Sequence, residues 1–191
     1  MSFLNSILKG FLGDKNATDL KEVKKVVAKI KAAEPAIQQL TDDGLREKTA
    51  EFQEKIKAAS ANVTSQIDQL KEQIDTTTDV DQKESLFGKI EGLKKEAYEL
   101  EEKVLAQILP EAFALLKETA RRLAQNGGIT VKATELDREF AATKDFVTID
   151  GDTAHYKNSW NAAGTEVVWD MVHYDTQFIG GVVLHSGKIA E

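Results

Sequence analysis

The sequence predicts an α+β chain, in which helices fill most of the length and a small antiparallel β unit follows. Three patterns predict this. Apolar residues recur at helical spacing from the N-terminus to about residue 125. Between residues 63 and 104 they follow the repeat of a coiled coil. Around residue 150, β-branched residues flank an Asp-Gly pair, which is a hairpin signal.

The first predicted helix covers residues 2–12, where the apolar side chains form one stripe opposite Asn5 and Lys9. Such a helix can lie in a membrane interface, with Phe3, Ile7 and Phe11 as the lipid contacts. It can equally pack within its own protein or a dimer. Both alternatives remain open from the sequence.

The next predicted helix runs from Asp19 to about Ala33, and Glu34-Pro35 predicts a break because proline disfavours helical geometry in the residue before it. A short helix is expected to follow, to about Leu40. Thr41 is then expected to cap another helix. The apolar positions of that helix are Leu45, Phe52 and Ile56.

Residues 58–104 are predicted to form an antiparallel coiled-coil hairpin. Apolar residues alternate steps of four and three on both sides of the polar stretch 75–81, which should be the turn. The seam positions are Val63, Ile67, Leu70, Ile74, Leu86, Ile90, Leu93, Ala97, Leu100 and Val104. A projecting arm or spacer is the favoured reading, and a docking surface for a partner is the alternative.

Pro110 is expected to open the next helix, which should end at Asn126-Gly127-Gly128. Residues 129–145 fit both a strand at their start and a helix at their end. A single antiparallel meander is expected after them. Its predicted parts are strand 146–149, a turn at Asp150-Gly151, strand 153–157, loop 158–164 and strand 166–169.

Composition limits the function. The formal net charge is −7, and the basic run between Lys21 and Lys31 is diluted by acids, so no nucleic-acid partner is expected. The absence of cysteine excludes disulfides and thiolate metal sites within the chain. No apolar run reaches the roughly 20 residues of a membrane span, and the N-terminus lacks the pattern of a secretory signal.

Metal and phosphate candidates are weak. His155, His173 and His185 lack metal-ligand spacing, so no metal site is expected. Asp150-Gly151-Asp152 is expected to be a turn, since the further acids of a calcium loop are missing. The stretch from Gly181 to Lys188 fails as a P-loop, because five residues separate its glycines and Ile189 stands where Ser or Thr is needed.

Three segments, in the same order, resemble the start of the SecA family of protein-export motors. They are Glu34-Pro35 with the stretch to Phe52, Leu109–Ala114, and His173–Leu184 followed by Gly187–Glu191. The resemblance divides the chain into an N-terminal helical segment (1–57) and a hairpin insertion (58–104). The start of the first nucleotide-binding domain follows in two pieces, 105–126 and 171–191, which a β-rich insertion (127–170) separates.

The resemblance implies that the intact protein is an ATPase, with ATP and Mg²⁺ as cofactors, that moves unfolded preproteins through the SecYEG channel. It implies that the intact protein has a RecA-like P-loop NTPase domain and that this chain forms one edge of that domain. It also implies a cytoplasmic protein that attaches peripherally to anionic lipid on the cytoplasmic face of the inner membrane, and a homodimer. The resemblance places the Walker A loop after the segment that ends at Glu191. No catalytic residue and no ATPase activity are therefore expected in this chain.

Gln177 is the one nucleotide ligand that the resemblance assigns to this chain. It stands in a Tyr-Asp-x-Gln motif similar to the family's adenine-reading glutamine. A carboxamide offers the acceptor and donor that adenine N6 and N7 require. The alternative is a surface glutamine that caps a backbone group. At the level of function, the alternatives are a non-enzymatic coiled-coil adaptor and a peripheral membrane anchor module.

Overall fold

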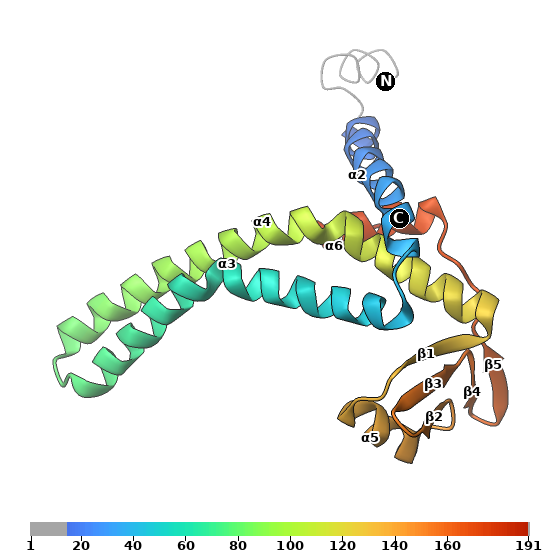
Figure 1. The fold of residues 1–191 in the computed structure, drawn as a ribbon. Helices are drawn as coiled ribbons and strands as arrows, with labels where there is room; N and C mark the ends of the chain where they lie inside the picture. Colours follow the sequence, from blue (N-terminus) through green and yellow to red (C-terminus); the bar gives the residue numbers. More distant parts are fainter. Residues whose placement is uncertain (1–14, 191) are drawn as a thin grey trace, which may run out of the picture. The chain divides into compact units, whose positions relative to one another are not determined.

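The computed structural model describes residues 15–190 (Figure 1). Most of these residues are helical, and the antiparallel strands follow residue 127, which confirms the α+β prediction. Residues 46–109 form one compact unit, and the described residues before and after them form a second. The finer division at residues 58, 105, 127 and 171 stays a prediction.

Helix α2 (Lys15–Gln38) continues through Pro35, so the predicted break and the separate short helix after it are wrong. A proline inside a helix removes one backbone hydrogen bond and costs about 3 kcal/mol. Burial on both sides of it offsets this cost. Ile30 and Ile37, which share one face of the helix, are 0% and 3% exposed.

Helix α3 (Asp42–Thr76) begins where the sequence predicts. The Thr41 hydroxyl accepts a hydrogen bond of 3.0 Å from the backbone N–H of Gly44. Asp42 and Asp43 occupy the first turn, where negative charge is favourable against the helix dipole. The predicted cap at Thr41 is therefore confirmed.

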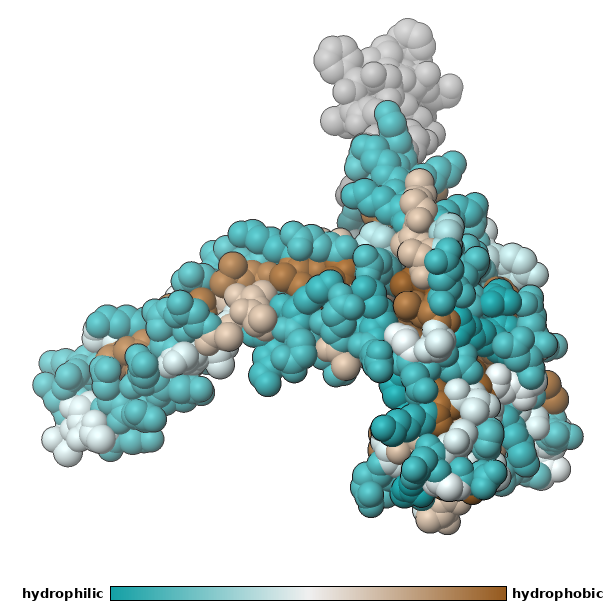
Figure 2. Space-filling model, in the orientation of Figure 1, coloured by the Kyte–Doolittle hydropathy of each residue, from teal (hydrophilic) through white to brown (hydrophobic). Residues whose placement is uncertain are grey.

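Helices α3 and α4 (Val80–Asn126) pack as a hairpin within the unit of residues 46–109. The turn covers Thr77–Asp79, inside the predicted stretch, and the Asp79 carboxylate caps α4 by accepting from the N–H of Asp81 at 3.0 Å. On the face shown in Figure 2, apolar side chains gather where the two helices meet and most of the remaining hairpin surface is hydrophilic. The buried seam consists of Val63, Ile67, Ile74, Leu86 and Ile90.

Helix α4 does not begin at Pro110, as the sequence predicts, but runs through it. As at Pro35, buried residues on both sides hold the helix together, here Ile108 and Ala114. The helix ends at Asn126 as predicted. Gly127 follows with a φ of 72°, a left-handed conformation that glycine adopts without a Cβ penalty.

The residues after α4 form one three-stranded sheet with a helix. The strands β1 (Gly128–Lys132), β2 (Val147–Asp150) and β3 (Thr153–Lys157) pair antiparallel in the order β1-β3-β2. Between β1 and β2 lies helix α5 (Glu135–Thr143), so both readings of residues 129–145 hold, one after the other. The predicted hairpin turn is present between β2 and β3, with Gly151 at a φ of 56°.

Strands β4 (Ser159–Ala162) and β5 (Thr165–Val168) form a separate two-stranded sheet. The predicted single meander and the predicted loop at 158–164 are therefore wrong. Asn158 redirects the chain, since its N–H donates to the Gly127 carbonyl and its own carbonyl accepts from the Trp169 N–H. The β4–β5 turn is Ala163-Gly164, and both residues have a positive φ. An Ala-Gly pair does not predict this turn geometry, because it lacks the Asn or Asp that usually precedes the glycine.

Arg122 is the polar centre of the second unit. Its side chain is 9% exposed, yet it donates to oxygens on α4, on α3, at the last residue of α2 and in the turn that follows α2. The carbonyls at this helix end have no partner within a helix, so the guanidinium satisfies them. The accepting atoms are Glu118 Oε1 at 2.7 Å, Asp42 Oδ1 at 2.6 Å, Leu40 O at 2.6 Å and Gln38 O at 3.3 Å.

Two aspartates extend this network to the sheet. Asp42 Oδ2 accepts from the Thr130 N–H at 3.0 Å, and Asp43 Oδ1 accepts from the Lys132 N–H at 2.8 Å. Because β1 is an edge strand, these N–H groups have no neighbouring strand to bind. The start of α3 therefore covers the free edge of the sheet.

We expect Arg122→Met to lower the free energy of unfolding by about 3 kcal/mol, because it leaves the Asp42 carboxylate and two turn carbonyls without their donor. Arg121→Met is the matched control. Arg121 also binds Glu118, but its side chain is 35% exposed, so the expected loss is at most about 1 kcal/mol. Chemical denaturation followed by circular dichroism measures both, and equal losses would contradict this role of Arg122.

The same cluster predicts a dependence on pH. Burial acts to raise the pKa of Glu118, but hydrogen bonds and charge from Arg121 and Arg122 outweigh it and lower the pKa below its usual 4.5. A carboxyl with a lowered folded-state pKa stabilises the fold above about pH 4.5 and loses that contribution as the pH falls further. The part of the acid destabilisation that arises from this carboxyl should be smaller in the Arg122→Met variant.

Candidate functional site

The candidate site lies where the chain leaves β5 and enters helix α6 (Asp175–His185). Tyr174 precedes the helix in an extended conformation, with φ −89° and ψ 162°. Asp175 provides the acid of the first turn. Phe178 and Val182, four residues apart, form the buried face that fixes how α6 packs.

Phe178 anchors α6 on the C-terminal half of α4. Its ring is 1% exposed and meets the Phe113 ring edge-on, with centroids 5.6 Å apart. His173 stacks on it at 6.1 Å, and Lys117 Nζ lies 5.6 Å from its centroid. A Cβ at position 181 would lie 2.8 Å from the Phe113 ring, so Gly181 is what allows the helices to approach.

Gln177 caps α6. Its Oε1 accepts a hydrogen bond of 2.7 Å from the backbone N–H of Tyr174, as the third residue of a capping box does. Its Nε2 lies 3.6 Å from the Met171 sulfur, which is a weak acceptor. The side chain is exposed. The Oε1 atom retains a second lone pair and the amide a second N–H, so Gln177 can present an acceptor and a donor side by side while it keeps its cap.

Ion pairs from α2 and α4 surround the start of α6. Lys31 Nζ lies 2.7 Å from Asp175 Oδ2, and Lys117 Nζ lies 2.8 Å from Glu34 Oε1. The hydrogen bond to Asp175 raises the pKa of Lys31, although both groups are exposed and add little stability. An open groove of about 670 Å³ lies here, lined by Lys31, Lys117, Asp170, Val172, His173, Tyr174, Asp175 and Thr176.

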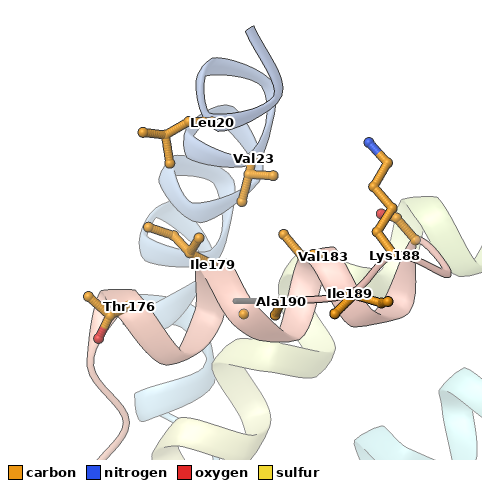
Figure 3. Close-up of a pocket in the computed structure, with 10 residues that line it drawn as sticks. Leu20, Val23, Thr176, Ile179, Val183, Lys188, Ile189 and Ala190 are labelled. Atoms are coloured by element: carbon orange, nitrogen blue, oxygen red, sulfur yellow. The ribbon is translucent and has the colours of Figure 1, made fainter. Parts of the chain in front are cut away.

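A second groove, of about 380 Å³, lies between α2 and α6. In Figure 3, Leu20 and Val23 of α2 and Ile179 and Val183 of α6 surround the same space. Its lining is mainly apolar, with Lys188 as the charged member. Such a lining fits an apolar occupant better than a phosphate group.

Of the predicted site residues, only Gln177 lies in the part of the chain that the structure describes. Gln177 stands at the start of α6, whereas Phe3, Ile7 and Phe11 lie outside the described residues. Among residues 15–190, no three His, Cys, Asp or Glu side chains form a group that could hold a metal ion. Asp150-Gly151-Asp152 lies at the β2–β3 turn, and Gly181 lies within α6 rather than in a loop.

The sequence patterns missed the residues that position this site. Lys31 belongs to the basic run that acids dilute, in which no pattern singles it out, yet it pairs with Asp175. Phe178 and Lys117 occupy ordinary helical positions with no motif of their own. His173 keeps a buried Nδ1 without a hydrogen-bond partner, which no spacing rule signals.

None of the helices in the described part of the chain combines the length and the apolar character needed to cross a membrane.

Comparison with known proteins extends over nearly the whole chain. The family model described as the SecA DEAD-like domain matches residues 8–191. The protein translocase subunit SecA of Flavobacterium psychrophilum is 51% identical over 191 residues, which is 100% of this chain. The subunits of the same name from Christiangramia forsetii and Porphyromonas gingivalis are 50% identical, over 191 and 187 residues.

The chain spans 17% of the length of each of these three relatives. Because two of the alignments cover all 191 residues, they include the stretches 58–104 and 127–170. No solved structure matches the chain.

Proposed function

The chain belongs to the SecA DEAD-like domain family, and from this membership we propose that it is part of an ATP-driven motor that moves unfolded preproteins through the SecYEG channel. The observation that carries the proposal is identity of about 50% along the entire chain to proteins named translocase subunit SecA. The activity, the substrates and the channel are proposed for a whole protein of which this chain corresponds to 17% of its relatives' length.

We infer two features of the architecture. Residues 105–126 and 171–191 contribute the edge of a RecA-like nucleotide-binding domain, which agrees with the DEAD-like description of the family. The hairpin of α3 and α4 is an antiparallel coiled coil. The alternating steps of four and three along its buried seam support this.

Phosphoryl transfer needs groups that hold the phosphates, a Mg²⁺ ion and a positioned water. The 191 residues contain no Gly-Lys-Thr or Gly-Lys-Ser motif to hold the phosphates and the metal. ATP and Mg²⁺ would therefore depend on residues that this chain does not contain. In nucleotide binding, the role of this chain would be confined to recognition of the base.

Gln177 is the residue proposed to read adenine. Adenine offers the N6 amine as a donor and N7 as an acceptor, and Gln177 has one lone pair and one N–H left to meet them. The exposed Tyr174 and the open groove beside it leave room for a planar base. Since the cap fixes the carboxamide, little side-chain entropy is lost on binding.

The N-terminal stripe is proposed to hold the protein on anionic lipid at the cytoplasmic face of the inner membrane. Phe3, Ile7 and Phe11 would enter the interface, while Lys9 would face the lipid headgroups. One basic residue gives only weak electrostatic attraction, so the apolar contacts would supply most of the affinity.

We expect Gln177→Glu, in the full-length protein, to lower the affinity for ATP about ten-fold. A glutamate at this position can still cap Tyr174, so α6 stays folded. The carboxylate cannot donate to adenine N7, and it repels that atom. Titration with a fluorescent ATP analogue, with the matching guanine nucleotide as control, measures the effect. If the affinity for ATP is unchanged, Gln177 serves only as a helix cap.

The 191-residue chain alone should hydrolyse ATP no faster than the background, because the phosphate-binding and metal-binding groups are missing. A coupled phosphate-release assay tests this, with the full-length protein as positive control. Turnover above background in the purified chain would refute the assignment of these groups to other residues.

The combined substitution of Phe3, Ile7 and Phe11 by Ser should reduce binding to vesicles of anionic lipid at least ten-fold, since burial of each side chain is worth about 1.5–3 kcal/mol. A matched variant on the polar face, Ser2→Asn with Ser6→Asn, should bind as the native protein does. Vesicle co-sedimentation measures both, and equal binding of all three proteins rejects a lipid role for the stripe.

A further inference from the structure

Met171, in the connection between β5 and α6, completes the contacts of the Gln177 carboxamide. The oxygen Oε1 accepts from the Tyr174 N–H at 2.7 Å, and the nitrogen Nε2 lies 3.6 Å from the Met171 sulfur. The sulfur thus meets the nitrogen end of the amide, which is the end that adenine N7 requires. A thioether is only a weak acceptor, so this contact leaves the amide nitrogen free to bind the base.

The Met171 side chain is open to solvent. It is 40% exposed, and an exposed thioether reacts with hydrogen peroxide to give a sulfoxide. In this step a sulfur lone pair attacks one peroxide oxygen, the O–O bond breaks as the S–O bond forms, and the second oxygen leaves as water. The sulfur loses the two electrons that the peroxide gains.

The sulfoxide oxygen would change what the Gln177 amide meets. It is polar and accepts hydrogen bonds strongly, whereas the thioether sulfur is nearly apolar. Because Nε2 already points at the sulfur, the new oxygen lies beside the amide nitrogen and holds its N–H groups. Adenine N7 is also an acceptor, so the oxygen repels it as well. Both effects oppose binding of the base.

We propose that Met171 is a site of reversible oxidation by peroxide, and that its sulfoxide lowers the affinity of this protein for ATP. The inference rests on the proposed role of Gln177 in reading adenine. Methionine sulfoxide reductases return the sulfoxide to the thioether. Peroxide therefore reduces the fraction of the protein that holds ATP, and the reductases restore it.

Peroxide treatment of the full-length protein tests the effect on ATP. The affinity of the native protein should fall about ten-fold, and methionine sulfoxide reductase should restore it. Met171→Leu is the matched control, because it keeps a similar volume without an oxidisable sulfur. It should bind ATP about two-fold more weakly than the native protein before treatment, since it loses only a weak contact, and treatment should not weaken it further. Titration with a fluorescent ATP analogue measures both proteins.

Mass spectrometry gives a readout that does not depend on ATP affinity. The tryptic peptide of residues 158–188 contains Met171 and no other methionine, so the added oxygen can be located in it. Peroxide should oxidise Met171 in the full-length protein, and a bound ATP analogue should slow this oxidation about five-fold, because the base covers the side chain. A Met171 that stays reduced while other methionines are oxidised would overturn the proposal.

The outcomes separate this inference from the proposed function. If Gln177→Glu leaves the affinity for ATP unchanged, the role of Gln177 in reading adenine fails. If that variant lowers the affinity but oxidation of Met171 does not, only the present inference fails. It fails equally if Met171→Leu loses as much affinity on treatment as the native protein does, or if the oxidised protein loses its helical circular dichroism.

Discussion

The buried guanidinium of Arg122 is the interaction on which the unit containing the candidate site depends. A single side chain satisfies the carbonyls after α2, a carboxylate at the start of α3 and Glu118 on its own helix. Burial of an unpaired charge would be costly, so each partner requires the others. The aspartates that meet Arg122 and the strand edge connect the helices to the sheet.

The candidate site is built on the same stretch of α4. Lys117 and Phe113, five and nine residues before Arg122 on α4, contact the Phe178 ring. Phe178 follows Gln177 directly, so a displacement of α4 would move the carboxamide with it. The cap on Tyr174 then fixes the direction of that carboxamide. Recognition of the base by Gln177 would therefore depend on the packing of Phe178 against α4, which does not itself touch the base.

Both prolines of the chain lie inside helices, and both local predictions based on them are wrong. The rule behind the predictions is sound, since proline removes one hydrogen bond and strains the preceding residue. It counts only local energy, however. Burial of Ile30 with Ile37, and of Ile108 with Ala114, offsets the loss at each proline.

The sequence by itself determined the features whose energies are local. The cap at Thr41, the turn near Thr77, the helix end at Gly127 and the turn at Gly151 are short-range preferences of single residues, and the hairpin seam is a periodicity along one chain. Sequence motifs also singled out Gln177 and the family. Only the tertiary structure decided the continuity through Pro35 and Pro110, the split into two sheets and the partners of Arg122. These depend on contacts between residues far apart in the chain, and no local pattern specifies which distant group will meet a given side chain.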